Sequence, residues 1–150
     1  MKIKTKDRLF VVVQFMLFVI YCFKIELYTF KTDYLIRSTG IVFLIFGFLL
    51  GIISVLQLNR NLSPYPTPKL ISSLITHGLY QYIRHPIYTG IFLFLFGNAL
   101  YSGSTFKVLV SLFILILFYF KTEYEEQQLS IKYSAYKTYK KTAGRFLPKF

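Results

Sequence analysis

The sequence has little charge for its length. Of its 150 residues, 16% are charged, 55% are hydrophobic and 20% are aromatic. A soluble domain of this size keeps a polar surface, and so few charged residues cannot cover the outside of a globule. Disordered chains are poor in aromatic residues, so the composition also excludes intrinsic disorder. We therefore expect a membrane protein.

Acidic residues are especially scarce. Six Asp and Glu stand against 18 Lys and Arg, which gives a formal net charge of +12. In a polar chain, this excess of positive charge would suggest a nucleic-acid partner. In a chain as apolar as this one, the expected partners are anionic membrane lipids, and we expect no nucleic acid.

Cysteine occurs once, at Cys22, and tryptophan does not occur. A single cysteine excludes an intramolecular disulfide and a cysteine-cluster metal site, so we expect no bound metal. Its position in an apolar run favours a packed small side chain. The sequence also has no glycine-rich dinucleotide fingerprint, which removes the usual sequence signal for a nicotinamide cofactor.

Four apolar runs are present, at residues 9–23, 40–58, 87–101 and 106–120. We expect four transmembrane helices, the first extending to about residue 28 with its aromatic and basic flanks. The last two runs are so close that they should form a helical hairpin. A cleavable signal peptide is the competing interpretation of the first run, but no small-residue cleavage site follows it. The expected fold is all-α, with residues 1–150 as one polytopic integral membrane domain.

The basic residues indicate an orientation. Of the 18 Lys and Arg residues, 14 lie before the first run, between the second and third, or after the fourth. By the positive-inside rule, both termini and the second loop are cytoplasmic, in the cell inner membrane or an endomembrane. The second loop and a C-terminal helix would then share one face of the membrane.

The second loop begins with alternating prolines, at Pro64, Pro66 and Pro68. Proline fixes the backbone and cannot donate a hydrogen bond, so this segment should run extended along the membrane surface. We interpret it as a spacer.

The same loop ends in a polar, aromatic run. Pro86 fits the first turn of a helix, whose N-terminus favours an anion nearby. Arg84 and His85 would lie beside that anion. Gly78 and Gly90 have no side chain, which allows a ligand or a neighbouring helix to approach closely. The tyrosines that can face a cation are Tyr80, Tyr82 and Tyr88.

The C-terminal tail supplies carboxylates. Glu123, Glu125 and Glu126 hold half of all acidic residues within four positions. The tail continues as a helical pattern whose expected buried stripe is Leu129, Tyr133 and Tyr136. Glu125 and Glu126 flank this stripe and should point towards the membrane-facing side, whereas Glu123 should face solvent. Residues 144–148 should end the helix and fold back over the site.

Each feature also has an ordinary explanation. Arg84 and His85 suit juxtamembrane cations, the tyrosines suit an interfacial belt, and Gly90 suits helix packing. The conjunction favours a site, because both polar segments lie on one membrane face.

Two ordered motifs carry a resemblance. The first is Gly78-x-Tyr80-x-x-x-Arg84-His85-Pro86-x-Tyr88-x-Gly90; the second is Glu125-Glu126-x-x-Leu129, followed by Tyr133, Tyr136 and Tyr139. Over residues 64–148 the chain resembles the isoprenylcysteine carboxyl methyltransferase and phospholipid methyltransferase group. Members of that group are integral membrane enzymes that use S-adenosylmethionine, and the resemblance implies this cofactor here. It implies cofactor-binding residues in the segments 76–90 and 121–148: Gly78, Tyr80, Arg84, His85, Pro86, Tyr88, Gly90, Glu125 and Glu126.

The chemistry of the cofactor agrees with these residues. S-adenosylmethionine presents a carboxylate, an ammonium and a ribose besides its sulfonium. Arg84 and His85 suit the carboxylate, and Glu125 or Glu126 suits the ammonium or the ribose hydroxyls. We expect Arg84, Glu125 and Glu126 to be catalytic and the acceptor to be amphiphilic or lipid-like. A carboxylate acceptor needs an orienting cation, whereas an amine needs a base such as a Glu; the sequence leaves both open.

Two other functions stay open at this stage. Sterol-reductase-like membrane enzymes resemble the C-terminal arrangement but use NADPH, and its phosphates would require Lys69, Lys121 and Arg145 to converge. A non-enzymatic membrane scaffold would tolerate replacement of Arg84, Glu125 and Glu126 apart from effects on stability.

Overall fold

A computed structural model describes residues 3–23, 25 and 28–149 of the chain. The α-helices are α1 (Thr5–Cys22), α2 (Tyr34–Leu58), α3 (Pro86–Ser102), α4 (Thr105–Lys132) and α5 (Tyr136–Thr142), and the 3-10 turns are η1 (Asn59–Asn61) and η2 (Gly78–Gln81). Across this described part, the β contacts are isolated bridges, Thr29 with Ser104 and Ile83 with Gly144. The expected all-α fold is confirmed.

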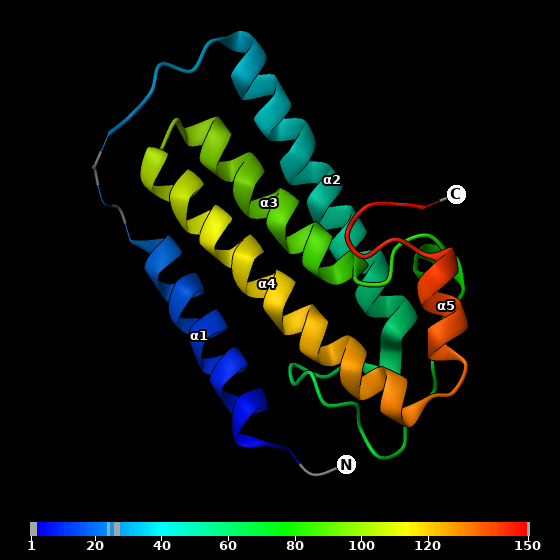
Figure 1. The fold of residues 1–150 in the computed structure, drawn as a ribbon. Helices are drawn as coiled ribbons and strands as arrows, with labels where there is room; N and C mark the ends of the chain where they lie inside the picture. The colour runs from blue at the N-terminus through cyan, green and yellow to red at the C-terminus, as the bar shows by residue number, and fades with distance from the viewer. Residues whose placement is uncertain (1–2, 24, 26–27, 150) are drawn as a thin grey trace.

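The four long helices lie side by side in the order α1, α4, α3, α2 (Figure 1). The N-terminal ends of α1 and α3 and the C-terminal ends of α2 and α4 lie at one end of the molecule, together with α5. The second loop and the C-terminal segment are at this same end. The sequence motifs therefore meet there.

Glycines set the closest helix contact, between α2 and α3. A Cβ added at Gly40 would lie 2.8 Å from the carbonyl oxygen of Gly97, and one at Gly47 would lie 2.7 Å from that of Gly90. A Cβ at Gly90 would in turn lie 2.7 Å from the backbone nitrogen of Gly51. Small residues let the backbones of membrane helices approach closely. Gly90, a candidate cofactor residue in the sequence, thus lies in a helix–helix contact.

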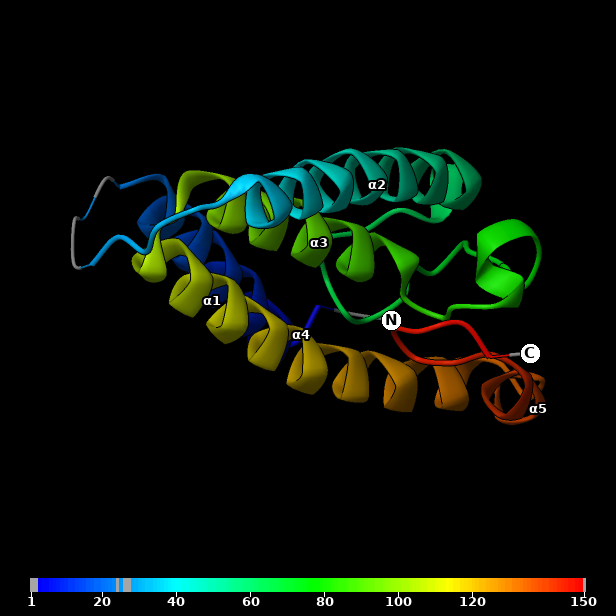
Figure 2. The ribbon, with the colours of Figure 1, turned by 90° about the horizontal axis from the view of Figure 1, so that it is seen from above.

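The predicted hairpin is formed by α3 and α4. Gly103 ends α3 in the left-handed conformation, with φ of 62°, and the Ser104 side chain caps α4 by accepting from the Lys107 N–H. Seen from above, the two helices start together at this turn and separate towards α5 (Figure 2).

Several helix boundaries differ from the expected spans. The first helix ends at Cys22 rather than near residue 28, and residues 24 and 26–27 of that expected span lie outside the described residues. α2 begins at Tyr34 because Asp33 caps it, accepting from the Ile36 N–H at 2.8 Å. The fourth helix continues well beyond residue 120 to Lys132. Apolar runs mark only the part of a helix that can face lipid, whereas helical hydrogen bonding continues through polar residues.

The tail does not form one continuous helix. α4 ends at Lys132, and α5 starts at Tyr136 after a short break. Tyr133 and Tyr136 still pack in one cluster with Leu129, Tyr139 and Ala143. The predicted buried stripe is therefore present, but it spans two helices.

Length and composition allow two described helices to cross a bilayer, namely α2 with its extension to Asn61 and α4; α3 is a shorter apolar helix. The outer side of α2 exposes large apolar side chains, including Val42, Phe46 and Leu56. A continuous exposed apolar surface of this kind suits contact with lipid.

Candidate functional site

The C-terminal segment folds back over the start of α3, as the sequence predicts. The Arg84 N–H donates to the Gly144 carbonyl at 2.8 Å, and the His85 N–H donates to the Arg145 carbonyl at 3.1 Å. The Thr89 hydroxyl donates to the Phe146 carbonyl at 2.9 Å. These bonds bring the Arg145 side chain into the neighbourhood of both motifs.

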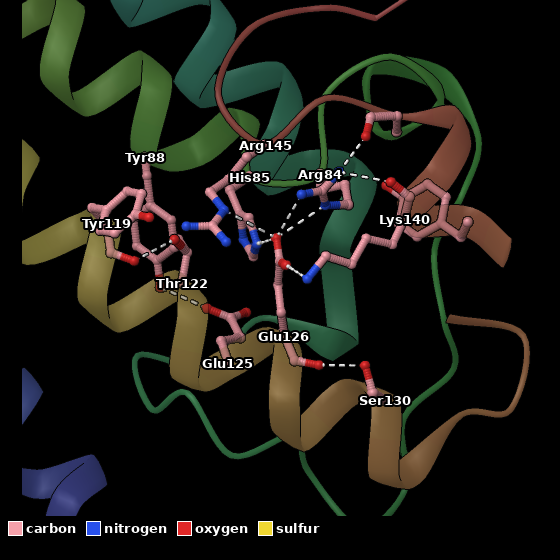
Figure 3. Close-up of polar contacts among 12 residues, drawn as sticks. Arg84, His85, Tyr88, Tyr119, Thr122, Glu125, Glu126, Ser130, Lys140 and Arg145 are labelled. Atoms are coloured by element: carbon pink, nitrogen blue, oxygen red, sulfur yellow. Dashed lines mark hydrogen bonds and ion pairs between the residues drawn. The ribbon is translucent and has the colours of Figure 1, made fainter. Parts of the chain in front are cut away.

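Glu126 is the centre of a buried ion-pair cluster (Figure 3). Its Oε1 lies 2.9 Å from Nη2 and 3.0 Å from Nε of Arg84. The same oxygen lies 3.3 Å from Nε2 of His85 and 3.5 Å from Nε of Arg145, while Oε2 lies 2.8 Å from Nζ of Lys140. The Glu126 side chain is 2% exposed. The two motifs therefore contact each other directly.

Arg84 makes several contacts inside the protein. Besides its two contacts with Glu126, its Nη1 donates to the Lys140 carbonyl at 3.1 Å and to the Ala143 carbonyl. Carbonyls at a helix C-terminus lack intrahelical donors, so the guanidinium completes the end of α5. All three nitrogens of Arg84 thus have partners within the chain.

The cluster carries an excess of positive charge. Arg84, Lys140 and Arg145 face the single carboxylate of Glu126. Even with His85 neutral, the positive groups outnumber the negative ones by two. An anion bound beside this cluster would be stabilised electrostatically.

A cavity of about 320 Å³ opens next to the cluster. Its volume is at the lower end of the range for small-molecule sites, roughly 300–1,000 Å³. Side chains from α1, the second loop, α3, α4 and α5 line it. Five of the predicted site residues are among them: Tyr80, Arg84, His85, Tyr88 and Glu125.

The other predicted site residues lie outside the cavity lining, which does not include Gly78, Pro86, Gly90 or Glu126. Gly78 has a positive φ of 63° and faces the Gln57 amide, whose nitrogen would lie 2.5 Å from an added Cβ. Pro86 begins α3 in the first-turn position that the sequence predicts. Gly78 and Pro86 therefore determine the backbone conformation beside the cavity.

Glu125 belongs to a second polar group on the cavity wall. The Tyr88 hydroxyl donates to Oε2 of Glu125 at 3.1 Å. The Lys121 ammonium lies 5.3 Å from the centre of the Tyr88 ring and donates to Oε1 of Gln14 at 2.6 Å. Lys121 is 1% exposed. Within the residues that the structure describes, no group of His, Cys, Asp and Glu side chains is placed to hold a metal ion.

Gln14 was not among the predicted site residues, and Lys121 was named only as a cation that the reductase alternative would require. Gln14 is the one amide in the first apolar run, and Lys121 is the first charge after the fourth. A polar side chain in an apolar helix is expected to have a partner inside the bundle. That signal indicates a contact, but the sequence does not identify the partner.

Three tyrosines at the α5 side of the cavity differ in their hydrogen bonding. The Tyr139 hydroxyl donates to the Tyr80 carbonyl at 2.5 Å, and the Tyr80 hydroxyl donates to the Ser54 carbonyl at 3.3 Å. Burial raises the pKa of Tyr139 to about 12, so it is protonated at neutral pH. Tyr136 is 1% exposed, and its hydroxyl has no hydrogen-bond partner among the described residues.

The proline-rich part of the second loop forms a wall of the cavity. It is held by Asp7 of α1, which is fully buried and accepts from the Thr67 N–H at 3.0 Å and the Thr67 hydroxyl at 2.8 Å. The interpretation of this segment as a spacer is therefore wrong. Its anchor lies 60 positions away in the sequence, so no local pattern could reveal it.

The chain is similar to known proteins. The family model described as phospholipid methyltransferase matches residues 35–136 of the chain. The chain is also similar to the solved structure of a eukaryotic intramembrane Ras methyltransferase, isoprenylcysteine carboxyl methyltransferase, with a TM-score of 0.70 and 22% sequence identity. That similarity covers 99% of this chain and 54% of the other, so the chain spans about half the length of that protein. The search of curated proteins finds no match.

Proposed function

The chain belongs to the phospholipid methyltransferase family, and from that premise we propose that it transfers a methyl group from S-adenosylmethionine to a lipid-like acceptor at the membrane. One observation carries the proposal: the two motif segments, far apart in the sequence, meet at one cavity. Arg84, His85 and Tyr88 line it from the start of α3, and Glu125 lines it from α4. A ligand in this cavity would touch both segments.

The cavity residues fit the polar groups of S-adenosylmethionine. The excess positive charge around Glu126 suits the ligand's carboxylate. Glu125 suits the ammonium or a ribose hydroxyl, because its Oε2 contacts only Tyr88 among the described hydrogen bonds. The buried Tyr136 hydroxyl is a further donor beside the cavity.

S-adenosylmethionine supplies a methyl group bound to a positively charged sulfur. Bound in the cavity, it would give this methyl carbon to the acceptor's lone pair and leave as the neutral thioether. The protein's part is to align the two reactants and exclude water. The proline-rich wall, held by Asp7, supports that enclosure.

The two acceptor chemistries require different residues. A carboxylate acceptor is already a nucleophile and requires an orienting cation, for which buried Lys121 is the available group. An amine acceptor must lose a proton, and Glu125 is the carboxylate that lines the cavity. Activity with carboxylate-bearing and amine-bearing lipids separates the two.

We further propose that α1 to α4 all cross the membrane, with both termini and the site on the cytoplasmic face. The segments that carry 14 of the 18 basic residues all connect to helix ends at the α5 end of the molecule. A cytoplasmic site would have direct access to S-adenosylmethionine.

Calorimetric titration of the detergent-purified protein with S-adenosylhomocysteine tests the cofactor. We expect saturable binding that Glu125→Gln weakens at least roughly tenfold, because a charged hydrogen bond is lost. Glu123→Gln is the matched control, since Glu123 is exposed on the same helix two positions away. Equal binding by both variants would contradict a role for Glu125, and no binding by the wild type would contradict the methyltransferase assignment.

A parallel titration with NADPH tests the reductase alternative. Of the three cations that it requires, Lys121 lines the cavity, while Lys69 and Arg145 do not. We therefore expect no saturable binding of NADPH. If the protein binds neither S-adenosylhomocysteine nor NADPH, the result would favour a non-enzymatic membrane scaffold.

A further inference from the structure

Tyr136 is a buried hydrogen-bond donor without an acceptor. It lies at the start of α5, lines the cavity and is 1% exposed. Its neighbours in the tyrosine series are satisfied: the Tyr133 hydroxyl donates to the Ser72 carbonyl at 2.7 Å, and that of Tyr139 donates to the Tyr80 carbonyl. Among the described residues, the Tyr136 hydroxyl alone of these three lacks a partner. Leaving a buried hydroxyl unpaired is unfavourable, so its retention requires a reason.

The surroundings of Tyr136 indicate what it would bind. Burial raises the pKa of its hydroxyl well above the usual value for a phenol, and Glu126, Arg84 and Glu125 lie within electrostatic reach of it. It therefore stays protonated at neutral pH and acts as a donor. The adjacent cluster has two more positive than negative groups. A negatively charged acceptor is favoured at this end of the cavity.

Most of the hydrogen-bonding capacity of Arg84 is already used inside the protein. Its Nε and Nη2 contact Glu126, and its Nη1 contacts the carbonyls of Lys140 and Ala143. These contacts use four of the five guanidinium N–H groups. The Tyr136 hydroxyl, in contrast, has no partner among the described residues and is wholly available to a ligand.

We propose that Tyr136 is a cofactor-binding residue whose hydroxyl donates a hydrogen bond to the carboxylate of the S-adenosyl ligand. In this arrangement Arg84 contributes its positive charge and holds α5 in place, while Tyr136 makes the contact. The inference rests on the proposed function, because it assumes that an S-adenosyl ligand occupies the cavity.

The test compares two ligands on the full-length protein in detergent. S-adenosylhomocysteine has the carboxylate, whereas 5′-methylthioadenosine has the same nucleoside and thioether but lacks the amino-acid group. For Tyr136→Phe we expect roughly tenfold or weaker binding of S-adenosylhomocysteine, from the loss of a hydrogen bond to a charged group. We expect unchanged binding of 5′-methylthioadenosine. Equal loss for both ligands would overturn the carboxylate assignment, and no loss for either would overturn the role of Tyr136.

Tyr139→Phe is the matched control for stability, one helical turn away in the same helix. It removes a hydrogen bond that exists without ligand, so its unliganded Tm should fall. Tyr136→Phe removes none within the described protein, so its unliganded Tm should stay equal or rise. A fall like that of Tyr139→Phe would assign Tyr136 a structural role and overturn the inference. If the wild type binds neither ligand, the proposed function itself fails, which is a different result from the failure of Tyr136 alone.

Discussion

The guanidinium of Arg84 lies 2.9 Å from the carboxylate of Glu126, although the two residues are 42 positions apart in the sequence. Each belongs to a different motif, and both side chains are less than 10% exposed. Together with Lys140 and Arg145, the pair fastens α5 and the C-terminal segment to α4. The paired motif residues therefore stabilise this end of the fold, and Arg84 also lines the cavity.

Replacing Glu126 should destabilise this end of the molecule. Glu126→Gln leaves the buried Arg84 without its counter-ion, and breaking a buried pair in this way costs about 3–5 kcal/mol. We expect a large fall in Tm in detergent and faster proteolysis within residues 136–149. Glu123→Gln, an exposed change on the same helix, should leave the Tm and the rate of proteolysis unchanged. Equal Tm values for the two variants would refute a stabilising role for the ion pairs of Glu126.

The glycine contact between α2 and α3 should tolerate no side chain at its centre. A Cβ at Gly47 would lie 2.5 Å from the backbone nitrogen of Phe94, so Gly47→Ala must separate the helices. We expect the free energy of unfolding, measured by thermal denaturation, to fall by about 1–3 kcal/mol. Gly51→Ala is the matched control on the same helix, because its Cβ would meet nothing within 4 Å. It should be neutral or stabilising by up to about 1 kcal/mol; the reverse order would contradict this packing.

The anchor of the proline-rich wall should affect ligand binding. Asp7→Ala removes the acceptor for both the Thr67 N–H and the Thr67 hydroxyl. We expect faster hydrogen exchange in residues 65–67 and weaker binding of S-adenosylhomocysteine, because the wall loses its fixed position. Asp33→Ala, which removes the cap of α2 at the other end of the molecule, should destabilise by about 1 kcal/mol without changing exchange in the wall. Unaltered exchange in Asp7→Ala would show that other contacts hold it.

The proposed orientation can be tested with the chain's single cysteine removed. In a Cys22→Ser background, Lys31→Cys and Lys137→Cys make the same substitution at exposed positions in the first loop and in α5. A membrane-impermeant thiol reagent should label Lys31→Cys in intact cells and Lys137→Cys only after permeabilisation. Labelling of both in intact cells would contradict the odd number of crossings that α2, α3 and α4 make between them, and the opposite pattern would reverse the orientation.

The lipid-facing character of the helices could be predicted because it depends on composition alone. Few charges and long apolar runs determine that the chain is helical and membrane-embedded, and Gly103 and Pro86 determine where helices end and begin. The Arg-His-Pro run and the Glu pair were identified as motifs because their spacing is local. The resemblance to membrane methyltransferases rested on the same local signals.

The partners of the site residues were decided only by tertiary structure. Arg84 pairs with Glu126, a contact that neither motif reveals by itself, and Gly90 packs against Gly51. The proline-rich segment is a cavity wall because Asp7 binds Thr67 from another helix. Periodicity determines which face of a helix is apolar, but a hydrogen bond depends on which distant group packing brings within about 3 Å. For the same reason, Tyr136 differs from Tyr133 and Tyr139 only once the helices are packed, when its hydroxyl alone of the three has no hydrogen-bond partner among the described residues.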